Sequence, residues 1–224
     1  MRSINLRKLI DFYDRKVPES IGHATAINAV MGEDLAISLF CDYAFRNNLS
    51  PQFLSEKCTQ GTNSGKRLDC WIEISENSKL IHFQTEIKNW SAHAFSGKFI
   101  PESESEDEMI LYRIGRWENQ FDSINRTLKQ DPAKKVLIKM KPLNQHAEIR
   151  PLIIFWDAMH PKGESKEYFS VDVSSDVFKK LWVFSMSNYV RNLIQKNIFE
   201  IKVEMPTVIN RFNWLNDFYR EIDE

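Results

Sequence analysis

Apolar and polar residues alternate along two stretches of the chain that a short turn separates. In the first stretch, RLDCWIEI at residues 67–74, the apolar positions are Leu68, Cys70, Ile72 and Ile74. In the second stretch, which ends in FQTEIK at residues 83–88, the apolar face carries Phe83, Thr85 and Ile87. Such alternation is typical of a β-strand with two different faces. Because residues 75–78 suit a hairpin turn, we expect residues 67–74 and 79–88 to form antiparallel neighbouring strands of one sheet.

Helical spacing replaces the alternation upstream. Five apolar residues with this spacing predict a helix from Ala29 to Arg46: Leu35, Ala36, Leu39, Phe40 and Tyr43. Further helices are expected at residues 1–22, 109–128, 187–197 and 207–222, and further strands at residues 53–58, 136–140, 152–156, 169–173 and 181–186. Residues 59–65 predict a turn, and the acidic, serine-rich residues 101–108 predict a mobile surface loop.

These elements predict one α/β domain over residues 1–224, because the chain has neither a repeat nor a long linker. We expect its core at about residues 25–160 and a C-terminal α/β extension at about residues 161–224.

The composition is that of an ordinary soluble domain, with 42% hydrophobic and 27% charged residues. The three cysteines, Cys41, Cys58 and Cys70, are odd in number and far apart, which argues against a disulfide framework and a zinc cluster. The charged N-terminus does not resemble a secretory signal, and no apolar run is long enough for a membrane helix. We therefore expect a cytoplasmic protein without a membrane partner. Its net charge of −1 means that any surface for nucleic acid has to be local.

The polar faces of the two strands carry groups that suit one kind of chemistry. Glu86 and Lys88 share a face of their strand, about 6.5 to 7 Å apart, and Asp69 lies on the neighbouring strand. Two carboxylates can bind Mg²⁺ or Mn²⁺, which lowers the pKa of a bound water and offsets charge on a phosphate. A lysine beside them can orient the attacking water or stabilise the developing charge. These residues favour metal-dependent phosphodiester hydrolysis.

The motif GKRLDCWIEI followed by FQTEIKNW resembles the core of the PD-(D/E)XK nuclease superfamily over residues 30–90. Asp69 matches the first acidic position, Glu86 the second and Lys88 the lysine, although Leu68 stands where many members have proline. The resemblance implies a restriction endonuclease-like core, a mixed central sheet flanked by helices, with one or two Mg²⁺ or Mn²⁺ ions. It also implies a nuclease that cleaves DNA rather than RNA.

Two further metal ligands are expected from this resemblance. The backbone carbonyl of Ile87 would be a third ligand, and Glu33, on the preceding helix, matches an acidic position that many members have. Glu33 has an alternative interpretation as a helix N-terminal acid that the helix dipole stabilises. The matching alternative for Glu86 and Lys88 is an exposed, charged strand face, and for Asp69 a solvated carboxylate.

Substrate contacts are predicted for Gln84, Lys98, Arg113 and Arg116. Gln84 shares the polar face of its strand, but a glutamine that only hydrogen-bonds within the sheet explains it equally well. The two arginines belong to a basic concentration that could contact phosphates or could form a solvated helix face and loop: Arg113, Arg116, Arg126, Lys129, Lys134, Lys135, Lys139 and Lys141.

Two other functions remain open. A non-catalytic nucleic-acid-binding or assembly module could have the same fold, although the intact Asp69, Glu86 and Lys88 argue against it. An unrelated α/β protein could carry the motif by coincidence. Targeting to a substrate would come from the C-terminal part of the chain or from a partner, either a second copy of the chain or another protein.

Overall fold

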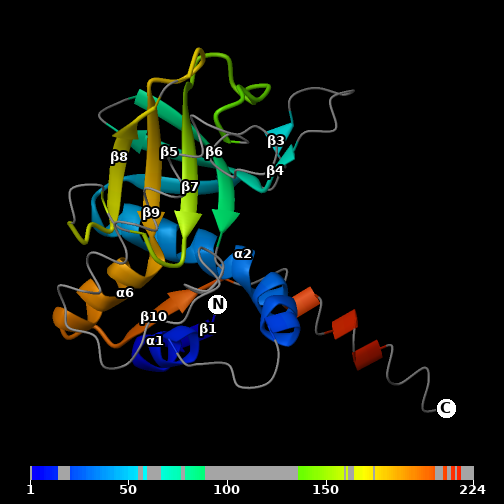
Figure 1. Ribbon diagram of the computed structural model, residues 1–224, viewed down its shortest axis with the longest axis vertical. Helices are drawn as coiled ribbons and strands as arrows, with labels where there is room; N and C mark the ends of the chain where they lie inside the picture. The colour runs from blue at the N-terminus through cyan, green and yellow to red at the C-terminus, as the bar shows by residue number, and fades with distance from the viewer. Residues whose placement is uncertain are drawn as a thin grey trace.

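The computed structural model describes residues 2–14, 21–54, 58–59, 67–76, 79–88, 136–158, 160, 164–173, 175–204, 209–210, 213–214 and 216–217. Its centre is a six-stranded mixed sheet with the strand order β2-β5-β6-β7-β9-β8 (Figure 1). The strands are β2 (Ser50–Leu54), β5 (Cys70–Glu76), β6 (Lys79–Lys88), β7 (Glu148–Phe155), β8 (Tyr168–Asp172) and β9 (Lys180–Ser185). Strands β2, β5 and β6 pair antiparallel, β6, β7 and β9 pair parallel, and β8 returns antiparallel to β9. The predicted α/β class with a mixed sheet is confirmed.

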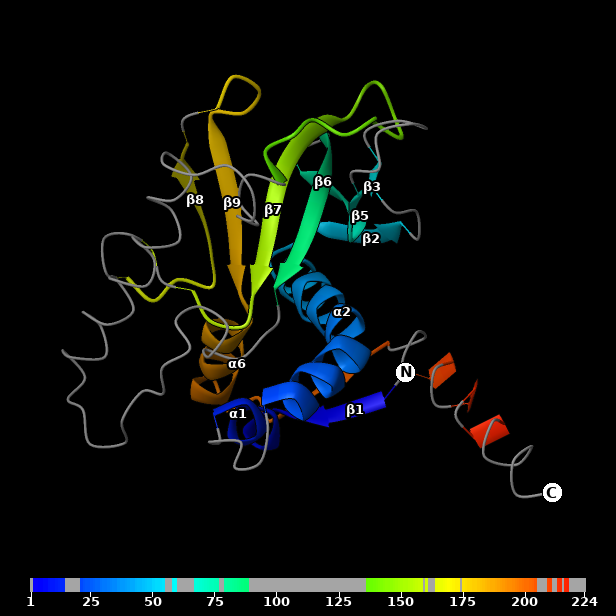
Figure 2. The same cartoon turned by 45° about the vertical axis from the view of Figure 1, so that its right-hand side comes forward.

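Helices cover one face of this sheet. They are α1 (Leu6–Asp14), α2 (Ile21–Arg46) and α6 (Met186–Gln195), and a two-stranded sheet of β1 (Arg2–Asn5) and β10 (Glu200–Val203) joins them. Figure 2 shows the three helices together below the strands. The Phe40 ring of α2 packs edge-on against Phe83 of β6 at 5.6 Å and against Phe184 of β9 at 5.2 Å between ring centroids. The apolar stripe predicted for this helix therefore forms the main core.

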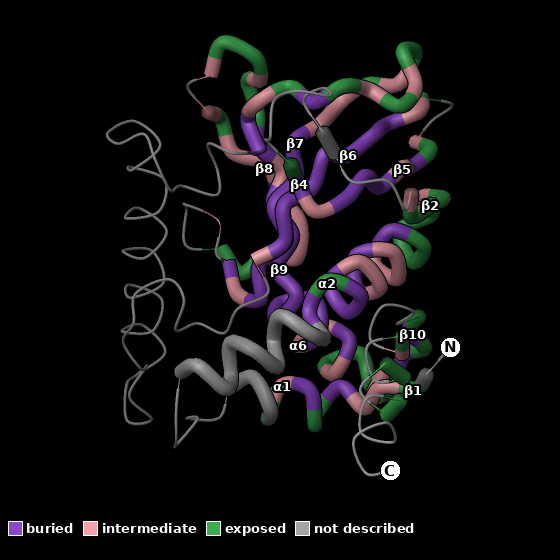
Figure 3. The backbone as a smooth tube through the Cα atoms, turned by 90° about the vertical axis from the view of Figure 1, so that its right-hand side faces the viewer, coloured by how far each residue is buried: buried purple, intermediate pink, exposed green. Residues whose placement is uncertain are grey.

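The second face of the sheet is buried as well. Trp71, Ile153 and Val183 form a second apolar cluster with residues 136–140, and each of the three is at most 1% exposed. Buried residues run along β5, β6 and β7 and along part of α2 in Figure 3. Strand β6 is therefore a central strand, and the polar side chains of its second face lie inside the protein.

Several predicted elements differ from the structure. The N-terminal residues form strand β1 and helix α1 rather than one long helix, because β1 pairs with the distant β10. The expected strand at residues 136–140 is wrong, since this segment has no ladder and packs across the second face. Strands β8 and β9, which come from the region expected to form the C-terminal extension, belong to the central sheet. In the region predicted as a helix at 207–222, residues 209–210, 213–214 and 216–217 are helical.

The strand predicted at residues 67–74 is interrupted. Residues Arg67–Leu68 form β4, which pairs with β3 (Cys58–Thr59), and Asp69 is a bend before β5. Leu68 consequently packs in the second cluster while Cys70 packs in the main core, so the expectation that they face the same layer is wrong. The bend resets the alternation of side chains at Asp69.

No helix in the described residues is both long enough and apolar enough to cross a membrane.

Helices α2 and α6 are joined by a polar contact that can be tested. The Tyr189 hydroxyl of α6, whose residue is 3% exposed, donates a hydrogen bond to the Asp42 carboxylate of α2, which also accepts from Arg46. Hydrogen bonds to charged groups contribute about 1.5–3 kcal/mol. We expect Tyr189→Phe to lower the free energy of unfolding by about that amount in chemical denaturation. If the wild type and Tyr189→Phe have equal free energies of unfolding, the Tyr189 hydroxyl does not contribute to stability.

Candidate active site

Glu86 and Lys88 lie together near the C-terminal end of strand β6. Lys88 Nζ donates a hydrogen bond of 2.7 Å to Glu86 Oε1. The Glu86 side chain is 1% exposed, whereas the Lys88 side chain is 26% exposed. A buried carboxylate is costly unless a positive group compensates its charge, and Lys88 does so from the same face of the strand. The pair is thus not the freely solvated strand face that was the alternative interpretation.

Asp69 joins this pair through the backbone of β6. Its own N–H donates to the Thr85 carbonyl at 3.0 Å, and its Oδ2 accepts the Ile87 N–H at 2.7 Å. The carboxylate therefore replaces a backbone carbonyl at the point where the β5–β6 ladder ends. The bend at Asp69 and the position of its side chain beside Glu86 have the same local cause.

The pKa of Asp69 is shifted by its burial and by the charged groups around it. Burial and, next to it, the negative charge of Glu86 raise the pKa of Asp69 to about 6. The Ile87 N–H and the Lys88 ammonium oppose this rise, and Glu33 adds a smaller repulsion. Two acidic groups are thus held together where a nearby cation would relieve their repulsion.

Glu33 lies on α2 and is exposed. Because α2 begins at Ile21, Glu33 is twelve residues into the helix (33 minus 21), more than three turns from its start. The interpretation as a helix N-terminal acid is therefore wrong, since the dipole effect is confined to the first turn. Glu33 contributes slightly to the raised pKa of Asp69, and its expected contact with a metal through water stays a prediction.

The donors fit a hard divalent cation, although side chains alone do not enclose one. In the described part of the chain, no group of three or more His, Cys, Asp or Glu side chains could hold a metal. Mg²⁺ commonly takes one or two carboxylates and completes its shell with water and phosphate oxygens. The Ile87 N–H faces Asp69, and the N–H and C=O of one strand residue point to the same side, so the Ile87 carbonyl also faces Asp69. Asp69, Glu86 and this carbonyl could hold Mg²⁺ or Mn²⁺.

Gln84 does not point toward solvent, as a contact with substrate would require. The residue is 0% exposed, and both amide hydrogens donate to backbone carbonyls, those of Val136 and Ile138, the latter at 2.8 Å. Its Oε1 accepts the Met140 N–H at 3.1 Å. The prediction of a substrate contact is corrected, because the whole amide is used to hold residues 136–140 against the sheet.

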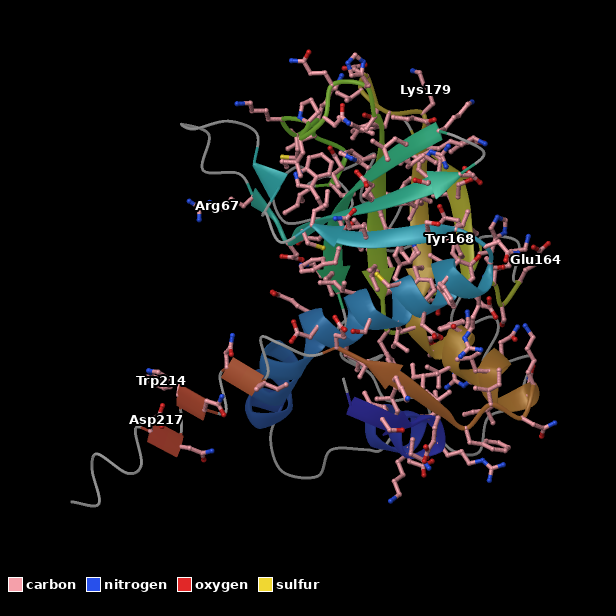
Figure 4. The ribbon with its side chains drawn as sticks, turned by 180° about the vertical axis from the view of Figure 1, so that it is seen from behind. Arg67, Glu164, Tyr168, Lys179, Trp214 and Asp217 are labelled. Atoms are coloured by element: carbon pink, nitrogen blue, oxygen red, sulfur yellow. The ribbon has the colours of Figure 1, made fainter. Side chains whose placement is uncertain are left out.

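The other predicted substrate contacts, Lys98, Arg113 and Arg116, lie outside the described residues. The structure adds one cation that the sequence interpretation missed. Arg67 is exposed on β4, two residues before Asp69, and Figure 4 shows its side chain projecting into solvent. Its position two residues before the first acidic position was the signal that could have identified it.

The site is only partly accessible, because the Glu86 side chain is buried while Asp69 is half-buried and the Lys88 side chain is 26% exposed. A cavity of about 300 Å³ lies elsewhere, between α2, β2 and β10, where Asp34, Phe53 and Val203 are among its lining residues. Neither Asp69 nor Glu86 lines it.

No protein-family model, no curated protein and no solved structure matches the chain.

Proposed function

We propose that the protein is a Mg²⁺-dependent nuclease that hydrolyses phosphodiester bonds, in DNA rather than RNA. The observation that carries this proposal is the meeting of Asp69, Glu86 and Lys88 at the end of β6. Asp69 accepts the N–H of the residue between the other two, and Lys88 bonds Glu86 directly. Two adjacent carboxylates beside one partly exposed ammonium are the groups that metal-assisted phosphoryl hydrolysis needs.

The fold supports the same proposal. Antiparallel β2, β5 and β6 continue into parallel β7 and β9, and helices cover one face of the sheet. A restriction endonuclease-like core has this kind of mixed sheet. The carboxylates lie on its central hairpin, as the resemblance implies.

Each residue has a distinct role in the proposed reaction. Asp69 and Glu86 hold Mg²⁺ or Mn²⁺ with the Ile87 carbonyl, and Glu33 assists through water. When bound, the ion supplies Lewis acidity and an acidic water ligand. Lys88 lies directly beside Glu86, where its charge can orient the attacking water and stabilise negative charge on the phosphate.

One observation favours a second function, a non-catalytic module that binds nucleic acid on the same fold. Side chains of the described residues offer no metal group of three or more members. Such a module would bind nucleic acid without cleaving it. A partner, either a second copy or another protein, would then supply any chemistry.

The deciding experiment is incubation of the pure protein with labelled duplex DNA, single-stranded DNA and RNA, each with Mg²⁺, with Mn²⁺ and with a chelator. We expect cleavage of DNA with metal and none with chelator. The Glu86→Gln protein, prepared in parallel, should remain intact but inactive, which excludes a contaminating nuclease. Binding without cleavage under every metal condition would favour the non-catalytic module.

Asp69→Asn tests the metal site separately from cleavage. The amide keeps the shape and can still accept the Ile87 N–H but lacks the negative charge that the cation requires. Loss of groups that support a metal ligand already lowers affinity by about 10–100-fold, so loss of a ligand charge should lower it at least tenfold. Calorimetric titration with Mn²⁺ measures this directly. Unchanged Mn²⁺ affinity would remove Asp69 from the site.

A further inference from the structure

The segment at residues 136–141 is held rigidly on the second face of the sheet. Val136, Leu137 and Met140 are at most 7% exposed and pack in the second apolar cluster. The Gln84 side chain binds the backbone of this segment with three hydrogen bonds. An anchored segment of this kind loses little conformational freedom when it binds a partner.

Two lysines of the same segment remain exposed. Lys139 and Lys141 alternate with the buried Met140, so both project outward from an anchored backbone. Residues 136–147 contain no acidic residue. Although the net charge of the chain is −1, this short stretch is locally basic.

The segment lies close to the carboxylates along β6. Gln84, which holds it, precedes Glu86 by two positions on the same face, about 6.5 to 7 Å along the strand. On the other side, Lys88 follows Glu86 by two positions, and Arg67 precedes Asp69 by two positions on β4. Cations therefore flank the carboxylate pair in both directions along the strand.

We propose that Lys139, Lys141 and Arg67 form a surface that binds the DNA phosphates on either side of the one at Asp69 and Glu86. Phosphates of one DNA strand recur about every 3.4 Å along the helix axis, so neighbouring phosphates reach these cations when one lies at the carboxylates. Such contacts fix the position of the duplex without reading its sequence. The inference rests on the proposed nuclease function and names the residues that position its substrate.

The salt dependence of binding tests this surface. Each lysine or arginine that contacts a phosphate of duplex DNA contributes about 0.9 to the slope of log K against log salt. We expect Lys139→Gln/Lys141→Gln to reduce that slope by about 1.8, and Arg67→Gln to reduce it by about 0.9. The measurement uses fluorescence anisotropy of a short labelled DNA duplex in chelator, where cleavage cannot occur, from about 50 to 200 mM salt.

The matched control is Lys196→Gln/Lys202→Gln, which removes two exposed lysines from the end of α6 and from β10. These elements lie on the opposite side of the sheet, so the control should retain the wild-type slope. All five substitutions to glutamine are at exposed positions, and the melting temperatures should remain unchanged. An unchanged slope in the Lys139/Lys141 and Arg67 variants, or an equal decrease in the control, would overturn the inference.

Cleavage measured in parallel with Mg²⁺ separates this inference from the proposed function. If the wild type cleaves DNA but the variants have the same salt slope as the wild type, the proposed phosphate-binding surface is wrong and the proposed nuclease function stands. If the variants show the expected changes in salt slope but the wild type does not cleave DNA with any metal, the phosphate-binding surface stands and the proposed nuclease function is wrong. Slope changes seen only with an RNA duplex reject DNA as the ligand, and a protein that binds no nucleic acid rejects both proposals.

Discussion

The Lys88→Met protein should cleave DNA about 10²–10³-fold more slowly than the wild type, as is typical when one electrostatic stabiliser of a transition state is lost. Methionine approximates the length of the lysine stem but has no charge. Because a group that acts mainly in the transition state changes kcat and not ground-state affinity, KM should change little and Mn²⁺ affinity should not fall. Single-turnover cleavage with saturating Mg²⁺ measures the rate.

The matched control is Lys166→Met. Lys166 also pairs with a glutamate, Glu164, but both side chains are nearly half exposed and lie outside the proposed site. This variant should cleave at the wild-type rate. If Lys88→Met does so as well, Lys88 has no role in the reaction. If it instead loses Mn²⁺ affinity together with activity, its role is to organise the metal ligands.

Local patterns predicted the part of the fold that contains the site. The alternation through Phe83 and Ile87 reports burial against α2, and the short turn before β6 determines which strand is its partner. The three groups Asp69, Glu86 and Lys88 were therefore predictable, because β6 carries two of them and the third immediately precedes its partner β5.

Other features depend on residues far apart in the chain. The apolar run at residues 136–140 has the composition of a strand, but a single side chain more than fifty positions away, Gln84, takes its backbone hydrogen bonds. Strand β1 likewise pairs with β10 at the other end of the described chain. A local pattern reports which residues are buried, not the distant group that buries them.

The position of Asp69 was predicted only in part. Its sequence neighbours alternate as in a continuous strand, and this hid the bend at which Leu68 and Cys70 enter different cores. The bend occurs because the Asp69 side chain, not a backbone carbonyl, accepts the Ile87 N–H. Competition between a short polar side chain and the backbone ladder is visible only in three dimensions.

The ion pair between Lys88 and Glu86 should also contribute to the stability of the folded protein. In the absence of metal, Lys88→Met leaves the buried Glu86 carboxylate without its ammonium partner. Removing one member of a buried pair costs about 3–5 kcal/mol, and the partial exposure of Lys88 places the expected loss near the lower value, about 3 kcal/mol. The double variant Glu86→Gln/Lys88→Met removes both charges and should recover most of this loss in urea denaturation. Lys166→Met, in an exposed pair, should cost at most about 1 kcal/mol.

Metal should then restore the stability that the Lys88→Met substitution removes, because Mg²⁺ bound at Glu86 would compensate the negative charge that Lys88 compensates in the wild type. Ligand that binds only the folded state stabilises it by about 2.7 kcal/mol when its concentration is about 100 times Kd. Mg²⁺ should therefore raise the melting temperature of Lys88→Met by more than it raises that of the wild type, in which Lys88 already compensates Glu86. The double variant, which lacks the carboxylate, should show almost no response. A Mg²⁺ response of equal size in all three proteins would mean that the ion binds elsewhere, and Glu86 would then be a structural partner of Lys88 alone.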